Sequence, residues 1–142
     1  MDANSFFISQ KVNQVASQAA SAIMRVRNAR TLRQVRDDGH VIVPSYLGSA
    51  GHDIPELRRL KQAQEERAKE LVDLDLAKMD AIAAQHLPIA ERIELLKTAY
   101  GNVRQHNWTF LRGEHPGLYT TATRHVERLI SQLQAKVSAT PD

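Results

Sequence analysis

Cysteine is missing from this 142-residue sequence, and aromatic residues make up only 5% of it. Without cysteine the chain forms no disulfide, no thiolate zinc site and no cysteine nucleophile, and a reducing compartment is favoured. Scarce aromatic residues leave little support for the stacking of nucleic-acid bases on side-chain rings. Both shortages therefore argue against a disulfide-stabilised secreted protein and against a protein that reads single-stranded bases.

Long hydrophobic runs are also missing. The longest uncharged stretch near the N-terminus lies between Lys11 and Arg25 and is rich in Ser, Gln and Asn. It is shorter than the roughly 20 residues that a helix needs to cross a bilayer. Because no basic segment precedes it, we predict no signal peptide. We therefore expect a cytoplasmic protein that does not contact a membrane.

The motifs that usually mark catalysis or cofactor binding do not occur. Six histidines are present, but no two have the spacing of a helical metal site. The dipeptide His52-Asp53 is also found in helical metal phosphohydrolases, yet a helix cap explains Asp53 and no motif supplies further ligands. The stretch GSAG lacks the Lys-Ser/Thr of a phosphate-binding loop, and no serine lies in a nucleophile elbow. We predict a protein that is not an enzyme and uses no metal or cofactor.

The composition that remains is typical of one globular domain. Hydrophobic residues make up 42% and charged residues 25% of the chain, whose length permits a modest core. The formal net charge is +3, and the excess lies in residues 1–52, which carry six Lys or Arg against three acids. So small an excess does not by itself indicate nucleic-acid binding. Concentrated on one helix end, it can still form a local basic patch.

Apolar residues recur at helical spacing, so we predict an all-α protein, a small bundle of about four helices in a single domain over residues 1–142. The third and fourth helices are joined by a short turn and predict a C-terminal antiparallel helical hairpin. The predicted segments are a basic-ended N-terminal helix within residues 1–38, a long loop over 39–53, a helical core over 54–138 and a frayed tail over 139–142.

Local signals suggest where these helices end. Gly39 suits the position after a helix, and a capping box that begins at Asp53 predicts the start of the second long helix. Between them, the apolar residues 41–43 can form a short strand, although the sequence offers no evident partner strand. The third helix is expected to start at Pro88, to carry an apolar stripe as far as Phe110 and to end at Gly113.

The first predicted helix, from residue 4 or 5 to residue 36, changes character along its length. Its apolar stripe extends to Val26, and the next two positions on that stripe are Arg30 and Arg33. Another flank is polar but uncharged, and we expect it to face either a polar neighbour or solvent. This flank consists of Gln10, Asn13, Gln14, Ser17, Gln18 and Ser21.

The arginines of the segment IMRVRNARTLRQVR, residues 23–36, are the candidate binding residues. No acid interrupts them, and on one continuous helix they would cover a little over half of the circumference. Guanidinium groups keep their charge and bind phosphates through two parallel hydrogen bonds. The candidates are Arg25, Arg27, Arg30, Arg33 and Arg36.

Three explanations of these arginines remain open. They bind a nucleic-acid backbone, they meet acidic residues of a partner protein, or they are solvated or paired within the chain. Acids available within the chain include Asp37, Asp38, Glu65 and Glu66. We favour a non-catalytic assembly subunit, oligomeric or part of a larger complex, that contacts a nucleic-acid backbone without sequence specificity. The alternative is a pure protein-interaction module, a scaffold or adaptor that forms homo-oligomers.

Overall fold

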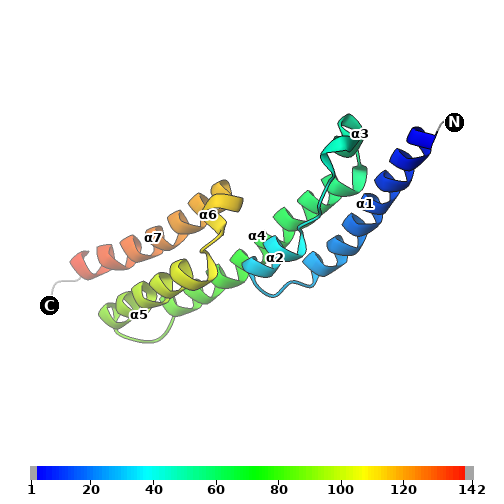
Figure 1. Ribbon diagram of the computed structural model, residues 1–142. Helices are drawn as coiled ribbons and strands as arrows, with labels where there is room; N and C mark the ends of the chain where they lie inside the picture. The colour runs from blue at the N-terminus through cyan, green and yellow to red at the C-terminus, as the bar shows by residue number, and fades with distance from the viewer. Residues whose placement is uncertain (1–2, 140–142) are drawn as a thin grey trace. The chain divides into compact units, whose positions relative to one another are not determined.

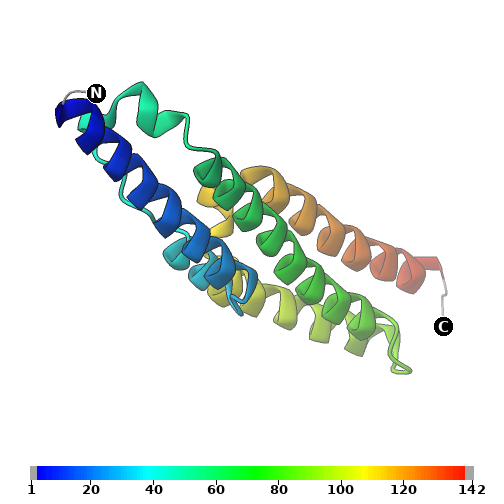
Figure 2. The ribbon, with the colours of Figure 1, turned by 90° about the vertical axis from the view of Figure 1, so that its right-hand side faces the viewer.

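The computed structural model describes residues 3–139, and every regular element in that range is helical, which confirms the all-α prediction (Figures 1 and 2). Within these residues no strand forms, so the strand expected over 41–43 is wrong. The elements are α1 (Ala3–Arg27), α2 (Leu32–Asp38), η1 (Ser45–Leu47), α3 (Ser49–His52), α4 (Pro55–Ala83), α5 (Ile89–Asn102), η2 (Val103–Asn107), α6 (Leu111–Glu114) and α7 (Pro116–Ala139).

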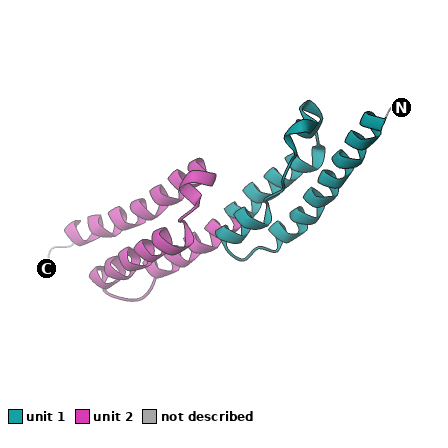
Figure 3. Ribbon diagram, in the orientation of Figure 1, with its two compact units in different colours: residues 1–68 teal, residues 69–142 magenta. Residues whose placement is uncertain are grey.

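The chain divides into two compact units (Figure 3). Unit 1 covers residues 1–68 and unit 2 covers residues 69–142, with the boundary inside α4. Among the described helices, none is long and apolar enough to span a bilayer. Of the tail expected to fray over 139–142, Ala139 ends α7, and the other three residues lie outside the described part of the chain.

The prediction of one helix through residue 36 is wrong, because the chain leaves the helix after Arg27 and re-enters it at Leu32. Thr31 is the N-cap of α2, and its side chain accepts a hydrogen bond of 3.1 Å from the Gln34 backbone N–H. The Gln34 side chain in turn accepts a 2.7 Å bond from the Arg30 backbone N–H. The first bond satisfies an N–H that a helix start leaves unpaired, and the second satisfies the N–H of the residue before the cap, so both favour the break.

The break also explains why arginines occupy the expected core stripe. Ala29, Leu32 and Val35 are buried, with exposures of 3%, 7% and 1%, so the inward-facing positions are shifted relative to those of one continuous helix. Two side chains of α4 bind this region. Arg67 donates a 2.8 Å hydrogen bond to the Ala29 carbonyl, and Gln64 donates a 3.1 Å bond to the Val35 carbonyl. The turn and α2 are thereby attached to α4 within unit 1.

Gly39 follows α2 as predicted, but the helix end is not the reason for a glycine at this position. Its φ of −87° is open to any residue, so no left-handed conformation requires glycine here. Instead, a Cβ at this position would overlap the side-chain amide of Gln64. Glycine therefore permits the close approach that lets Gln64 bind the Val35 carbonyl.

The segment expected to be a loop over 39–53 is partly helical, because it contains η1 and α3. Asp53 is the C-cap of α3 rather than the N-cap of α4, and its N–H donates to the Ser49 carbonyl at 3.1 Å. Ile54 precedes the first residue of α4 and is only 2% exposed, in a cluster with Val15 and Leu47. Burial of this isoleucine takes precedence over the capping signal of Asp53, since an apolar side chain gains more from burial than a cap contributes.

In unit 2 the third predicted helix also ends early. It stops as an α-helix at Asn102 and continues as the π-helical turn η2, whose Trp108 N–H donates to the Val103 carbonyl at 2.8 Å. Trp108 is 1% exposed, and its indole N–H donates to Asp75 at 3.0 Å. A buried indole needs an acceptor for its N–H. The π-turn accompanies this burial and separates α5 from the short helix α6.

Helices α5 and α7 pack against each other in unit 2 (Figure 2). The Tyr100 hydroxyl donates to the Glu127 carboxylate at 3.2 Å, and burial of the tyrosine, together with that carboxylate, raises its pKa to about 12. On the apolar side of this contact, Leu96, Ala122 and Val126 are fully shielded from solvent. Helix α7 begins at Pro116, which lacks the N–H that a first helical residue leaves unpaired.

Candidate anion-binding surface

The five candidate arginines lie on three successive pieces of unit 1 instead of one helix. Arg25 and Arg27 occupy the last turn of α1, Arg30 lies in the turn that follows, and Arg33 and Arg36 belong to α2. All are exposed except Arg36, which is half-buried. The broad face expected on a single helix is therefore not formed, and each arginine has to be located separately.

Two of the arginines interact with a carboxylate of their own chain. Asp37 lies 2.8 Å from the Arg36 guanidinium and 3.8 Å from that of Arg33. Because Arg33 and Asp37 are 73% and 51% exposed, their interaction is weak and screened by solvent. By contrast, no carboxylate within residues 3–139 forms an ion pair with Arg25, Arg27 or Arg30. The charges of these three guanidinium groups are therefore not balanced by an ion pair within the described residues.

The structure brings Arg25 and Arg30 together at one depression of about 380 Å³ where α1 ends. Arg30 reaches it from the turn, so the helix break itself places the two guanidinium-bearing residues around one hollow. The amide side chains of Asn28 and Gln34 also line it, as does a single acid, Asp38. We call this hollow the break depression.

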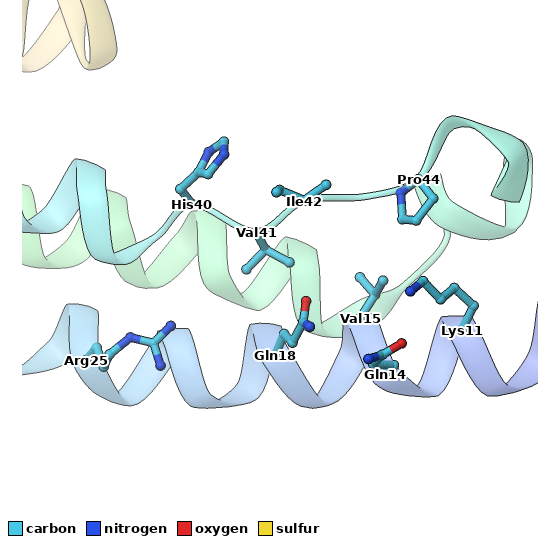
Figure 4. A pocket seen from close by; sticks show the side chains of 9 residues that line it. All are labelled: Lys11, Gln14, Val15, Gln18, Arg25, His40, Val41, Ile42 and Pro44. Carbon is cyan, nitrogen blue, oxygen red and sulfur yellow. The ribbon is translucent and has the colours of Figure 1, made fainter.

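Arg25 also lines a second hollow, of about 350 Å³, which we call the strap cleft (Figure 4). One wall is α1, and the other is the non-helical segment 40–44, which runs alongside α1 in the figure. Its polar lining comes from three basic residues and two amides and includes no carboxylate: Lys11, Arg25, His40, Gln14 and Gln18.

Since Arg25 belongs to both hollows, they form one surface with Lys11 at one end and Arg30 at the other. We call the set Lys11, His40, Arg25 and Arg30 the cationic strip. Along the axis of α1 the step from residue 11 to residue 25 corresponds to about 21 Å. A polymer of negative charge is thus a better match to this surface than a single small anion.

Sequence reasoning identified two members of the strip and missed Lys11 and His40. The polar, uncharged flank of α1 was the available signal, because Gln14 and Gln18 of that flank line the strap cleft. Nothing in the sequence showed that residues 40–44 would lie across from them. That proximity arises because Val41 packs against the cluster formed by Val15, Leu47 and Ile54.

Other sites considered from the sequence do not assemble. Among residues 3–139, no three His, Asp or Glu side chains gather in a way that could hold a metal ion. Asp80 and His125 contact each other at 2.7 Å, but no third ligand joins this pair within the described residues. The described residues therefore form a basic surface on unit 1 but no cluster of metal ligands.

No protein family, curated protein or solved structure matched this chain.

Proposed function

We propose that this protein is a non-catalytic assembly subunit that binds the phosphate backbone of a nucleic acid through the cationic strip. In this proposal the chain forms a bundle of about four principal helices, with a C-terminal antiparallel hairpin, and acts as an oligomer or as part of a larger complex. Its anionic partner lies on unit 1, along α1 and the break that follows it.

One observation carries the proposal: the strap cleft is lined by Lys11, Arg25 and His40 without any carboxylate, and it adjoins the depression that holds Arg30. If basic side chains only neutralise acids of their own chain, they are expected to form ion pairs with those acids. Here Asp37 pairs with arginines of α2, whereas no carboxylate within the described residues forms an ion pair with Lys11, Arg25 or Arg30, although Asp38 lines the break depression. An external anion would supply the missing negative charge.

The length and chemistry of the strip favour a nucleic-acid backbone. At 3.4 Å per nucleotide of one strand, about 21 Å spans roughly six phosphates. Arginine binds phosphate oxygens through paired N–H groups, and the amides of Gln14 and Gln18 can donate further hydrogen bonds to phosphate or sugar. Such contacts position a backbone without reading its sequence, so we expect affinity without sequence preference.

The test is a salt titration of binding to labelled duplex and single-stranded DNA and RNA. Three phosphates neutralised on duplex DNA by Lys11, Arg25 and Arg30 predict a slope of log K against log salt of about −2.7. The double variant Arg25→Glu with Arg30→Glu should weaken binding strongly, and its slope should fall to about −0.9 or disappear. A matched control makes the same charge change at Arg58 and Arg59, which are exposed on α4 and line neither hollow.

Two results would contradict this proposal. One is the lack of any binding at low salt by the full chain. The other is equal loss of affinity in the strip variant and in the control variant, which would show that only total charge matters. Far-UV circular dichroism of both variants establishes that helicity is retained, so that a loss of binding is not a loss of folding.

An exposed aromatic pair supports a second candidate function, that of a protein-interaction module such as a homo-oligomeric scaffold or adaptor. Phe6, Phe7 and Tyr46 are 56%, 54% and 55% exposed, and the rings of Phe7 and Tyr46 stack with centroids 5.9 Å apart. Clustered exposed aromatic residues are typical of protein interfaces. If this function holds, Phe7→Ser should lower the native mass measured by sedimentation, whereas the strip variant should leave that mass unchanged.

A further inference from the structure

Unit 2 contains a basic hollow of its own, which plays no part in the function proposed above. It is a depression of about 400 Å³ beside η2 and α6. Its chemically important lining residues are Arg104, Gln105, Trp108, Arg112 and Tyr119. No carboxylate lines it, so it resembles the strap cleft in charge although it is built from different helices.

Arg104 is held in place by uncharged groups. Its guanidinium carbon lies 5.2 Å from the centroid of the Tyr100 ring, within the range of a cation–π contact. A hydrogen bond to the Tyr119 side chain raises the pKa of Arg104, with the neighbouring tyrosines and Glu127 adding to the effect. The side chain is thus oriented, yet no carboxylate of the described residues forms an ion pair with it.

The π-turn explains how a second arginine joins the first. Arg104 lies on η2 and Arg112 on α6, eight positions later. On one straight α-helix, eight positions would separate two residues by about 12 Å along the axis. The π-turn and the non-helical residues after it interrupt the axis, and both arginines line the same hollow. Single π-turns within helices are frequent at functional sites.

Trp108 forms the buried part of the lining of this hollow. Trp108 lines the hollow but is only 1% exposed, and Asp75 accepts the hydrogen bond from its indole N–H at 3.0 Å. Asn107 donates to the other oxygen of the same carboxylate at 3.3 Å. The carboxylate of Asp75 is therefore used on the buried side of the tryptophan and does not line the hollow with the arginines.

From these contacts we infer that the hollow in unit 2 is a binding site for a phosphate group, held between Arg104 and Arg112. Guanidinium pairs match the tetrahedral oxygens of phosphate through parallel N–H donors, and Gln105 can add an amide N–H. The phosphate comes either from free inorganic phosphate or from the end of a nucleic-acid strand. This inference does not depend on the cationic strip of unit 1.

The only tryptophan in the chain lies at this hollow, which provides a direct assay. Sodium phosphate, titrated into the full-length protein at constant ionic strength, should change Trp108 fluorescence with saturation. Arg112→Gln should weaken the apparent affinity at least about tenfold, because a charge-assisted contact is lost. Arg104→Gln should do the same. Arg124→Gln, an exposed position on α7 that does not line the hollow, is the control and should leave the titration unchanged.

A second arm identifies the source of the phosphate. Short single strands with and without a 5′-phosphate are compared in the same titration. Tighter binding of the phosphorylated strand, lost in Arg112→Gln, assigns the site to a strand end. A response to inorganic phosphate alone assigns it to the free ion.

The inference is overturned if phosphate produces no saturable change, if sodium chloride at equal ionic strength produces the same change, or if Arg112→Gln behaves as wild type. Arg112 is exposed, so its substitution leaves the fold intact and its result is decisive. The strip variant, Arg25→Glu with Arg30→Glu, separates the two proposals. It should strongly weaken nucleic-acid binding by unit 1 while leaving the phosphate titration at Trp108 unchanged.

Discussion

The buried contact between Asp75 and Trp108 leads to a quantitative prediction about stability. Asp75 is 8% exposed and is the one buried charged residue within the described part of the chain. It accepts hydrogen bonds from the Trp108 indole at 3.0 Å and from the Asn107 amide at 3.3 Å. Asp75→Ala removes both acceptors, and we expect it to destabilise unit 2 substantially.

The size of the stability loss in Asp75→Ala depends on whether each donor finds another acceptor. Asn107 is exposed, so water can replace its lost bond, but the indole of Trp108 is 1% exposed and would remain unpaired. A buried donor without a partner costs about 1–3 kcal/mol. Relief from burying the Asp75 charge offsets part of that cost. We expect a net loss of about 2 kcal/mol for Asp75→Ala, and less than about 1 kcal/mol for Asp75→Asn, which retains an oxygen for the indole.

The assay is urea unfolding followed by Trp108 fluorescence, which reports on unit 2. With a denaturant slope of about 2 kcal/mol per molar, the midpoint for Asp75→Ala should fall by roughly 1 M. Combining Asp75→Ala with Trp108→Phe removes donor and acceptor together. That double variant, followed by circular dichroism, should be more stable than the sum of the single effects predicts, by about 1 kcal/mol or more.

Two outcomes would refute the reasoning. If Asp75→Ala costs less than about 0.5 kcal/mol, the indole is satisfied by another group or by water. If Asp75→Asn is as damaging as Asp75→Ala, the charge of the carboxylate, and not its ability to accept the indole hydrogen, stabilises the unit.

Three further predictions concern single contacts. Gly39→Ala should displace the Gln64 side chain and cost about 1 kcal/mol in thermal unfolding, whereas Gly113→Ala, which meets open space in α6, should not destabilise. Because the folded state raises the pKa of Tyr100 to about 12 from 10.0, it binds that proton more tightly than the unfolded chain. The stability gained from this proton is fully present below pH 10 and is lost as the pH rises from 10 to 12. Tyr100→Phe has no such proton, so the part of the fall in unfolding free energy that comes from Tyr100 over this pH range should disappear. Leu96→Ala, at a position 0% exposed, should cost about 2–5 kcal/mol in urea unfolding.

Helix formation itself was predictable from the sequence. Stripes such as Ile93, Leu96 and Tyr100 on α5, and Ala122, Val126 and Leu133 on α7, repeat at helical spacing, and all six residues are buried. Pro55 and Pro116 begin α4 and α7, as expected for a residue that lacks an N–H. These features depend on residues that are neighbours along the chain, so the sequence contains them directly.

The helix ends were predicted less well, because distant contacts decide them. The bonds from the Gln34 backbone N–H to Thr31 and from the Arg30 backbone N–H to the Gln34 side chain are local, and the pattern Thr-x-x-Gln, typical of a capping box, could have been recognised. The predicted N-cap at Asp53 and the early end of α5 differ from this, because contacts with residues far along the chain decide both. Burial of Ile54 against Val15, and of Trp108 against Asp75, outweighs the local preference in each.

The basic surfaces also depend partly on the sequence alone and partly on the tertiary structure. Composition and order of residues alone determined that the chain is helical, that it has no cysteine chemistry, and that its excess positive charge lies near residues 25–36. Only the tertiary structure decided that Arg25 would share a cleft with Lys11 and His40, and that Arg104 would share a hollow with Arg112. Charge and helical period are properties of the chain read in order, whereas a binding surface requires side chains that packing brings together from separate segments.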